Sequence, residues 1–236
     1  ANRISLPVSL NEKARGHNLL FEIMKWFVLK KGLISYSPAH VGAFLKSSSE
    51  VDFPDLQFVF TPASYTEGMI GKLQEFPGIT CGVWQSRPLS RGYVRASTNK
   101  ITDPPLIQPN YLKEKYDQDI LTKGVKMCRL LLATSKMKKI SVYETLPGEE
   151  IKKDQQILSF IRNNGATVYH AIGSCRMGID ENAVVTPSLK IKGLRNIRIA
   201  DASIMPTMPS GNTNAATLMI AEKASDIIKK DLQSVI

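Results

Sequence analysis

The stretch Ile199–Lys223, "IADASIMPTMPSGNTNAATLMIAEK", joins a strand pattern to a helix pattern through a short loop. Ile197 and Ile199 alternate with Arg198, which predicts a strand that ends in an acid, Asp201. A helix is predicted from about residue 212 toward residue 233, with a buried stripe formed by Ala216, Ile220, Ala224, Ile227 and Ile228. One strand and one helix cannot bury a core alone, so this unit must complete a larger sheet.

The start of this helix is a candidate ligand site. Helix starts carry unpaired N–H groups and a partial positive charge, which suit an anionic or electron-rich ligand edge. The segment "SGNTN", residues 210–214, lies at this start. Asn212 and Thr213 are also residue types that cap helices without any ligand, and the helix start alone favours that interpretation.

A second stretch, "VYHAIGSCRMG" at residues 168–178, holds His170, one of three histidines in the chain. Gly173 and Gly178 allow backbone to approach a ligand closely, although a lone histidine is often only a satisfied core or turn residue. Arg176 is either a fixed positive charge of the site or the partner of a carboxylate. A nucleophile pair of Cys175 with His170 lacks a third orienting group, and no GxSxG elbow for a serine nucleophile is present.

The chain upstream is a mixture of strand and helix patterns. Leu56, Phe58 and Phe60 alternate on one face of a predicted strand, whereas Leu19, Ile23 and Phe27 recur at helical spacing. Helices are predicted at 11–31, 117–136 and 153–163, strands at 39–47, 56–64, 79–88 and 92–98, and an extended loop at 102–112. These patterns predict a mixed sheet domain at 1–180, followed by the strand–loop–helix unit at 181–236.

Composition excludes several classes of function. The 236 residues are 43% hydrophobic and carry a formal net charge of +10, but the lysines form scattered pairs without an aromatic-rich basic stripe. We therefore expect no nucleic-acid partner. No run of eighteen apolar residues is present, so no membrane span is expected. Three widely spaced cysteines indicate reduced thiols and a cytoplasmic location, and no metal-ligand spacing occurs.

Two long blocks of this sequence resemble a known family. "YHAIGSCRMG" (169–178), followed by "IRIADASIMPTMPSGNTNAATLMIAEKASDII" (197–228), is similar to the C-terminal signature of the glucose–methanol–choline (GMC) flavin oxidoreductases. "RPLSRGYVRAST" and "DPPLIQPNYL" resemble the substrate-domain pattern of the same family. The resemblance is good from about residue 85 to the end and looser from residue 30. Choline-dehydrogenase-like and aryl-alcohol-type members are most similar.

The resemblance implies both a fold and a reaction. The fold would be α+β, with a mixed, mainly antiparallel sheet covered by helices in a substrate-binding domain, plus the last strand and helix of an α/β FAD-binding domain. The family oxidises alcohols by hydride transfer to FAD. His170 stands at the position of the family's active-site histidine and would take the hydroxyl proton. Asn212 stands at the position of the second His or Asn and would hold the same oxygen; imidazole suits base chemistry near neutral pH.

The resemblance also implies which residues would contact the cofactor. Asp201 matches the family's FAD-contacting acid, and Ala202 beside it would let the cofactor lie close. Thr213 and Asn214 at the helix start would stabilise the negative charge of reduced flavin.

The sequence also departs from the family pattern. The dinucleotide fingerprint GxGxxG is absent, and family members are more than twice this length, so we expect a C-terminal fragment whose partner is the N-terminal FAD-binding half of the same protein. Such a fragment is expected to be inactive alone. Where choline-processing relatives carry an acid, this chain has His40 and Val41, which argues against choline as the alcohol substrate. Trp84 and Tyr169 are candidate pocket residues, with core packing as the alternative for Trp84.

Two alternatives come from other classes. Some GMC relatives are hydroxynitrile lyases that keep FAD without using it for redox chemistry. A non-catalytic binding domain with a basic surface is the other, and it would bind nucleic acid or anionic lipid in a salt-dependent way.

Overall fold

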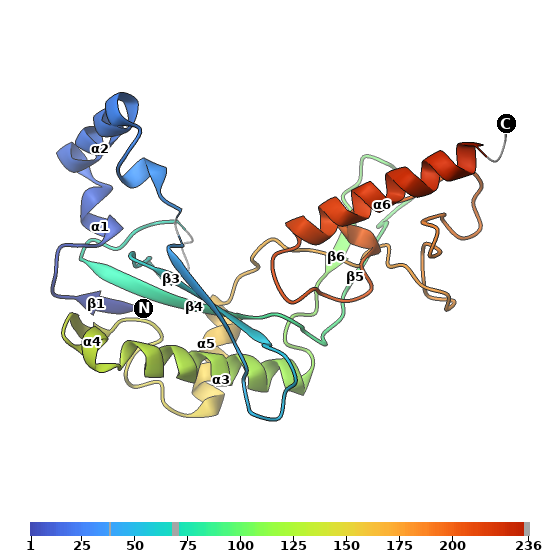
Figure 1. The fold of residues 1–236 in the computed structure, drawn as a ribbon. Coiled ribbons are helices and arrows are strands. Elements are labelled where there is room, and N and C mark those ends of the chain that lie inside the picture. The colour runs from blue at the N-terminus through green and yellow to red at the C-terminus, as the bar shows by residue number, and fades with distance from the viewer. Residues whose placement is uncertain (38, 68–70, 234–236) are drawn as a thin grey trace. The chain divides into compact units, whose positions relative to one another are not determined.

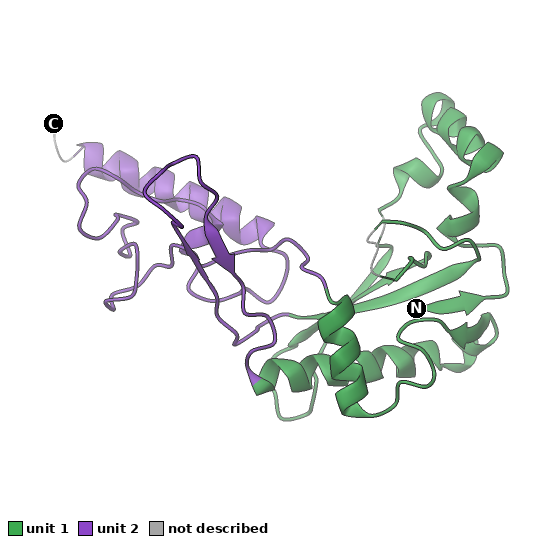
Figure 2. Cartoon of the chain, turned by 180° about the vertical axis from the view of Figure 1, so that it is seen from behind, with its two compact units in different colours: residues 1–85, 115–165 green, residues 86–114, 166–236 purple. Residues whose placement is uncertain are grey.

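The chain forms two compact units in a computed structural model that describes residues 1–37, 39–67 and 71–233. The first unit comprises residues 1–85 and 115–165, and the second comprises residues 86–114 and 166–236 (Figure 2). The predicted domains, 1–180 and 181–236, are defined by substrate binding and cofactor binding. The two compact units do not test these roles, so the division stays a prediction.

The first unit is built on a five-stranded sheet with the order β2-β3-β4-β1-β7 (Figure 1). Its strands are β1 (Asn2–Ile4), β2 (Val41–Leu45), β3 (Leu56–Thr61), β4 (Gly78–Gln85) and β7 (Ser141–Glu144). Every neighbouring pair in it is antiparallel. The predicted α+β class with a mainly antiparallel sheet is therefore confirmed.

Helix α3 (Lys115–Leu132) packs on this sheet through one buried face. Its residues Ile120, Gly124, Cys128 and Leu132 are buried at intervals of four, and Ile120 and Cys128 share a core with Leu56 and Phe58 of β3. A side chain at Gly124 would place its Cβ 2.9 Å from Val83 Cγ2 of β4. The helix therefore lies so close to the sheet that a side chain at this position would force its neighbours to move.

The predicted helix at 117–136 is interrupted near its end, and a further helix packs beside it. Thr134 is extended, with φ −62° and ψ 153°, and separates α3 from α4 (Ser135–Lys138). The helix α5 (Asp154–Asn164) matches the predicted helix at 153–163 and packs against α3.

Two helices replace the single helix predicted for residues 11–31. They are α1 (Leu10–Lys13) and α2 (Gly16–Leu29), followed by the short 3-10 helix η1 (Leu33–Ser35). Arg15 breaks the helix because its backbone is extended and its guanidinium donates to the carbonyls of Leu73 and Gln74, at 2.7 and 3.0 Å. The second helix ends at Leu29 and is followed by a left-handed Lys30, so it stops short of the predicted end at residue 31.

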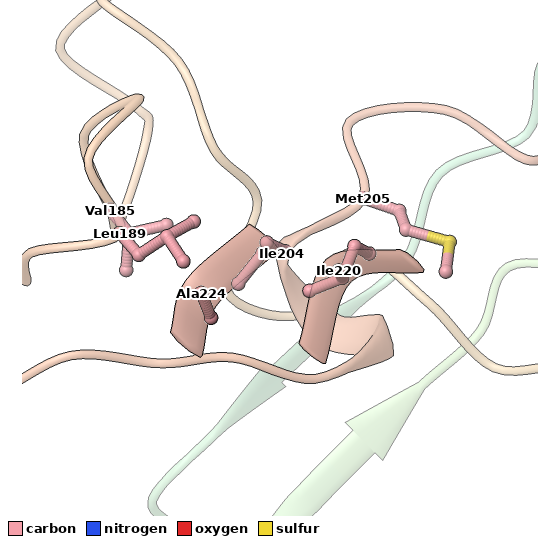
Figure 3. Packing of buried hydrophobic residues seen from close by; sticks show 6 residues of the cluster. All are labelled: Val185, Leu189, Ile204, Met205, Ile220 and Ala224. Carbon is pink, nitrogen blue, oxygen red and sulfur yellow. The ribbon is translucent and has the colours of Figure 1, made fainter. Parts of the chain in front are cut away.

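The second unit contains the two-stranded antiparallel sheet of β5 (Tyr93–Arg95) and β6 (Leu106–Gln108), the 3-10 helix η2 (Ala202–Ile204) and the helix α6 (Asn214–Gln233). The strand β6 lies inside the segment predicted as an extended loop. The core of the second unit packs the loop after residue 178 against η2 and α6. Its buried residues are Val185, Leu189, Ile204, Met205, Ile220 and Ala224 (Figure 3). Of the predicted helical stripe, Ala216, Ile220, Ala224 and Ile227 face this core, whereas Ile228 is exposed.

The predicted strand at 197–201 was wrong. Arg198 makes only an isolated antiparallel bridge with Lys190, and the backbone leaves the extended region at Leu189 (φ 66°) and Asn196 (φ 62°). These left-handed residues on either side of the bridge prevent a continuous ladder.

Among the described residues, no helix is long and apolar enough to cross a membrane.

Candidate functional site

The segment that carries His170 is anchored to η2 by backbone hydrogen bonds. The N–H of Cys175 donates to the carbonyl of Ser203 at 3.0 Å, and the N–H of Met177 donates to the carbonyl of Ile204 at 2.8 Å. Gly173 has φ 79°, and a Cβ there would lie 3.2 Å from the carbonyl of Met205. Glycine thus allows a close approach to the protein's own backbone, and the predicted approach to a ligand stays a prediction.

The segment that carries Asn212 is held at both ends. On one side, Arg87 Nε donates to Ser210 Oγ at 2.7 Å. On the other side, the N–H and the hydroxyl of Thr217 both donate to the carbonyl of Thr213, at 2.9 and 2.8 Å, which begins α6. The side chains of residues 210–213 are therefore placed by a loop contact and by a 20-residue helix.

These two segments meet at His170. The Nδ2 atom of Asn212 lies 2.8 Å from His170 Nε2, and the hydroxyl of Thr213 lies 3.2 Å from His170 Nδ1. An amide nitrogen can only donate, so Nε2 is the acceptor, and a neutral imidazole carries its proton on Nδ1. Nδ1–H then donates to Thr213 Oγ1. The arrangement leaves the lone pair of Nε2 directed toward Asn212.

The pair is open to a ligand. His170 is half-buried, and Asn212 is exposed within the unit that contains both. Tyr169, next to the histidine, is left-handed with φ 61° and 78% exposed, so its ring does not pack into the core. Imidazole and amide thus lie outside the buried core of this unit.

The predicted cofactor residues lie on the adjoining elements. Asp201 is exposed, and its Oδ1 accepts from the N–H of Ser203 at 2.8 Å, so this carboxylate caps η2. Ala202 opens η2 and is half-buried, whereas Asn214 opens α6 and is exposed. The structure brings Thr213 against His170 and gives Asp201 a capping contact, and a cofactor role for either residue stays a prediction.

Arg176 is the partner of a carboxylate, one of its two expected roles. Its guanidinium donates to both oxygens of Asp180, at 2.8 and 2.5 Å. These hydrogen bonds lower the pKa of Asp180 to about 2. The charge of Arg176 is thereby matched by a carboxylate within the same loop.

The remaining candidate pocket residues belong to the first unit. His40 contacts Tyr36 edge-on, with ring centroids 5.4 Å apart, and both line a pocket of about 240 Å³. Trp84 Nε1 donates to Gln57 Oε1 at 2.9 Å across β3 and β4, which agrees with the packing alternative for Trp84.

One contact of the site was missed by reasoning from the sequence. Arg87 contacts Ser210 in the loop before Asn212, although Arg87 and Ser210 are 123 positions apart in the chain. The only signal available was that Arg87 opens the block "RPLSRG", which resembles the family pattern. A resemblance marks such a residue without saying what it contacts.

Comparison with known proteins matches this architecture to one family. The model of the family described as GMC oxidoreductase matches residues 88–221, more than half of the chain. An alcohol dehydrogenase [acceptor] of Pseudomonas putida is 40% identical over 235 residues, 99% of this chain and 42% of that protein. The mitochondrial choline dehydrogenase of Homo sapiens is 34% identical over 226 residues, 94% of this chain and 38% of that protein. The chain therefore spans about two fifths of the length of these curated relatives.

Solved structures agree with the sequence relatives. Pyridoxine 4-oxidase from Mesorbium loti matches with a TM-score of 0.73 and 26% identity, over 80% of this chain and 37% of that one. A formate oxidase of Aspergillus oryzae RIB40 matches with a TM-score of 0.86 over 100% of this chain and 46% of that one; at 18% identity it is similar in fold alone.

Proposed function

The chain belongs to the GMC oxidoreductase family, and on that premise we propose that it is the C-terminal portion of an FAD-dependent enzyme that oxidises an alcohol to an aldehyde or ketone. The observation that carries this proposal is the pairing of His170 Nε2 with Asn212 Nδ2 at 2.8 Å at the start of α6. The names of the relatives, an alcohol dehydrogenase and a choline dehydrogenase, support a CH–OH donor.

The residues of the second unit fit a flavin by the chemistry of their donors. The first intrahelical hydrogen bond of α6 is donated by Thr217, so the N–H groups of Asn214, Ala215 and Ala216 lie before it at the positive end of the helix. Asn214 and Ala215 are exposed, and alanine side chains leave the backbone accessible. These groups, with Thr213, would hold the electron-rich edge of the flavin ring, and Asp201 with Ala202 would hold another part of FAD.

FAD, when bound, supplies the acceptor for the hydride that leaves the alcohol carbon. The protein's own part is proton transfer and positioning. The substrate hydroxyl would displace the Asn212 amide from Nε2 and donate its proton to that nitrogen, while Asn212 Nδ2 would donate to the substrate oxygen. Thr213 holds the proton of the neutral imidazole on Nδ1, so Nε2 is available as the base from the outset.

The same proposal includes a partner. Because the chain matches about two fifths of each curated relative, and because it has no GxGxxG fingerprint, the dinucleotide-binding half would come from the N-terminal part of the same protein. The predicted domains then follow, with residues 1–180 binding substrate and residues 181–236 completing the FAD-binding domain. A cytoplasmic location belongs to the same set of proposals.

The test is the anaerobic absorbance of the flavin in the complete protein, titrated with a panel of primary alcohols that includes choline. Bleaching of the flavin band would support hydride transfer and identify the substrate class. A protein that carries flavin which no alcohol bleaches would favour a lyase-like member, and a complete protein without flavin would contradict the proposal. Bleaching by choline would also overturn the inference drawn from His40 and Val41.

A further inference from the structure

The helix α2 presents an apolar face that its own unit does not cover. The structure describes no residue of this helix as buried. Leu20, Phe21, Met24, Phe27 and Val28 are between 64% and 76% exposed. Their spacing places them within one arc of the helix surface. In Figure 1 the helix projects from the sheet of the first unit, at the blue end of the chain. A solvent-exposed stripe of five large apolar side chains is unusual unless it meets a partner.

The opposite side of α2 is anchored, so the apolar face has a defined direction. Leu19, Ile23 and Trp26 are half-buried on that side. Glu22 Oε2 accepts from the N–H of Leu33 at 2.6 Å, which ties η1 back to the helix. A Cβ at Gly32 would lie 2.4 Å from Glu22 Oε2, so glycine permits this closure. The exposed stripe therefore lies on the side of α2 opposite its contacts with the rest of the unit.

The charges around this face have one sign. Residues 16–31 contain three lysines and a single acid, Glu22, whose side chain is 12% exposed and pairs with Lys25 at 3.7 Å. Lys30 and Lys31 are exposed at the C-terminal end of the helix. The Nζ atom of Lys30 lies 5.4 Å from the ring centroid of Trp26 and 5.7 Å from that of Phe27. Lysine beside aromatic rings at the border of an apolar stripe is the pattern of a helix that lies in a membrane interface.

We propose that α2 binds the surface of an anionic lipid bilayer, with its apolar face in the boundary between headgroups and acyl chains, and with Lys30 and Lys31 against the lipid phosphates. Charge complementarity favours this partner over a second copy of the chain, because two copies would each bring a formal net charge of +10 and the same lysines to the contact. Nucleic acid offers phosphates but no apolar phase for Phe21 or Phe27. The inference does not depend on the proposed alcohol oxidation.

The test is co-sedimentation of the complete protein with vesicles of phosphatidylcholine alone and of phosphatidylcholine mixed with equal parts of phosphatidylglycerol. We expect binding to the anionic vesicles that weakens with added salt. Phe27→Ser/Val28→Ser and Lys30→Glu/Lys31→Glu should each reduce the partition coefficient by about tenfold or more, because the first removes apolar insertion and the second reverses the attraction.

Matched controls exist elsewhere in the chain. Lys229→Glu/Lys230→Glu changes net charge by the same amount at an exposed pair on α6, and Ile101→Ser/Ile179→Ser removes two apolar side chains that are 101% and 91% exposed. Both controls should keep the partition coefficient of the unchanged protein. Three outcomes would overturn the proposal: no binding of the complete protein to anionic vesicles, as expected if the N-terminal half of the protein covers this face of α2; equal loss in the controls; or, in the α2 variants, unchanged vesicle binding together with an altered oligomeric state, which would make the face a contact between copies.

Discussion

His170 Nε2 lies 2.8 Å from Asn212 Nδ2, although the two residues are 42 positions apart in the chain. The contact pairs a group that can take a proton with a group that can donate a hydrogen bond but does not titrate. In the proposed reaction both would contact the same substrate oxygen.

Replacing His170 should remove the base. In the complete enzyme, His170→Gln keeps a polar side chain but cannot accept the hydroxyl proton near neutral pH, and we expect the rate of flavin reduction to fall by about 10²–10⁴-fold. Rapid mixing with alcohol under anaerobic conditions measures this rate. Flavin content and the thermal midpoint should stay unchanged as controls. A rate within twofold of the unchanged enzyme would exclude His170 as the base.

Asn212 should act on the substrate oxygen without titrating. Asn212→Ala removes one donor to an oxygen on which negative charge develops, and losses of about 10²–10³-fold in kcat are typical for such a donor. We expect the shape of the pH–rate profile to be retained, because an amide contributes no ionisation. Steady-state kinetics across pH would measure both quantities. A change in KM alone would show that Asn212 binds substrate without stabilising the reacting state.

Thr213 should position the imidazole through Nδ1. Thr213→Val is nearly isosteric but removes the hydroxyl that lies 3.2 Å from Nδ1, so the imidazole loses the contact that holds its proton on that nitrogen. We expect kcat to fall by about tenfold with little change in KM. Thr213→Ser keeps the hydroxyl and should restore most of the rate. A loss in Thr213→Ser as large as that in Thr213→Val would show that the hydroxyl alone does not account for the effect, and would contradict a role through Nδ1.

The pair of Arg176 and Asp180 makes one part of the second unit sensitive to acid. The pKa of Asp180 in the folded protein is about 2, below the ordinary value of about 3.9. The ionised carboxylate therefore stabilises the folded loop at pH values above about 3.9. This contribution is lost as the pH falls from there through about 2. Carbon-detected NMR of the Asp180 carboxyl should show a midpoint near 2, and Arg176→Gln should return it toward the ordinary value. Arg195→Gln, an exposed arginine of the same unit, should leave the midpoint where it is.

Gly124 should be intolerant of any side chain. A Cβ there would lie 2.9 Å from Val83 Cγ2 and 3.3 Å from Leu56 Cδ2. Overpacking costs about 1–3 kcal/mol, whereas alanine gains at most about 1 kcal/mol over glycine in helix propensity. We expect Gly124→Ala to lower the thermal midpoint of the complete protein by about 2–4 °C.

A second substitution separates crowding at Gly124 from other causes. Val83→Ala makes room for the new methyl group, so Gly124→Ala should cost less in that background than in the unchanged protein. If the effects of the two substitutions on the thermal midpoint are additive, the new methyl group does not clash with Val83, because the helix and the sheet have moved apart.

Much of the fold follows from local patterns. The alternation of Leu56 and Phe58 placed β3, and the spacing of Ile220 and Ala224 predicted the buried side of α6. The misses occurred where one backbone position overrides the pattern. Arg15 divides the helix predicted at 11–31, and left-handed Asn196 prevents the strand predicted at 197–201. Such breaks depend on contacts with distant carbonyls or neighbouring segments, which periodicity does not record.

The sequence by itself determined the family resemblance, the amphipathic elements and the two segments that carry His170 and Asn212. Only the tertiary structure decided that these side chains meet, that Thr213 stands behind the imidazole, and that Arg176 is paired with Asp180. It also decided which side of α2 is anchored and which is exposed. The physical reason is that hydrophobic periodicity and turn chemistry act over a few neighbouring residues, whereas a site is made by packing between segments whose separation along the chain carries no information about distance in space.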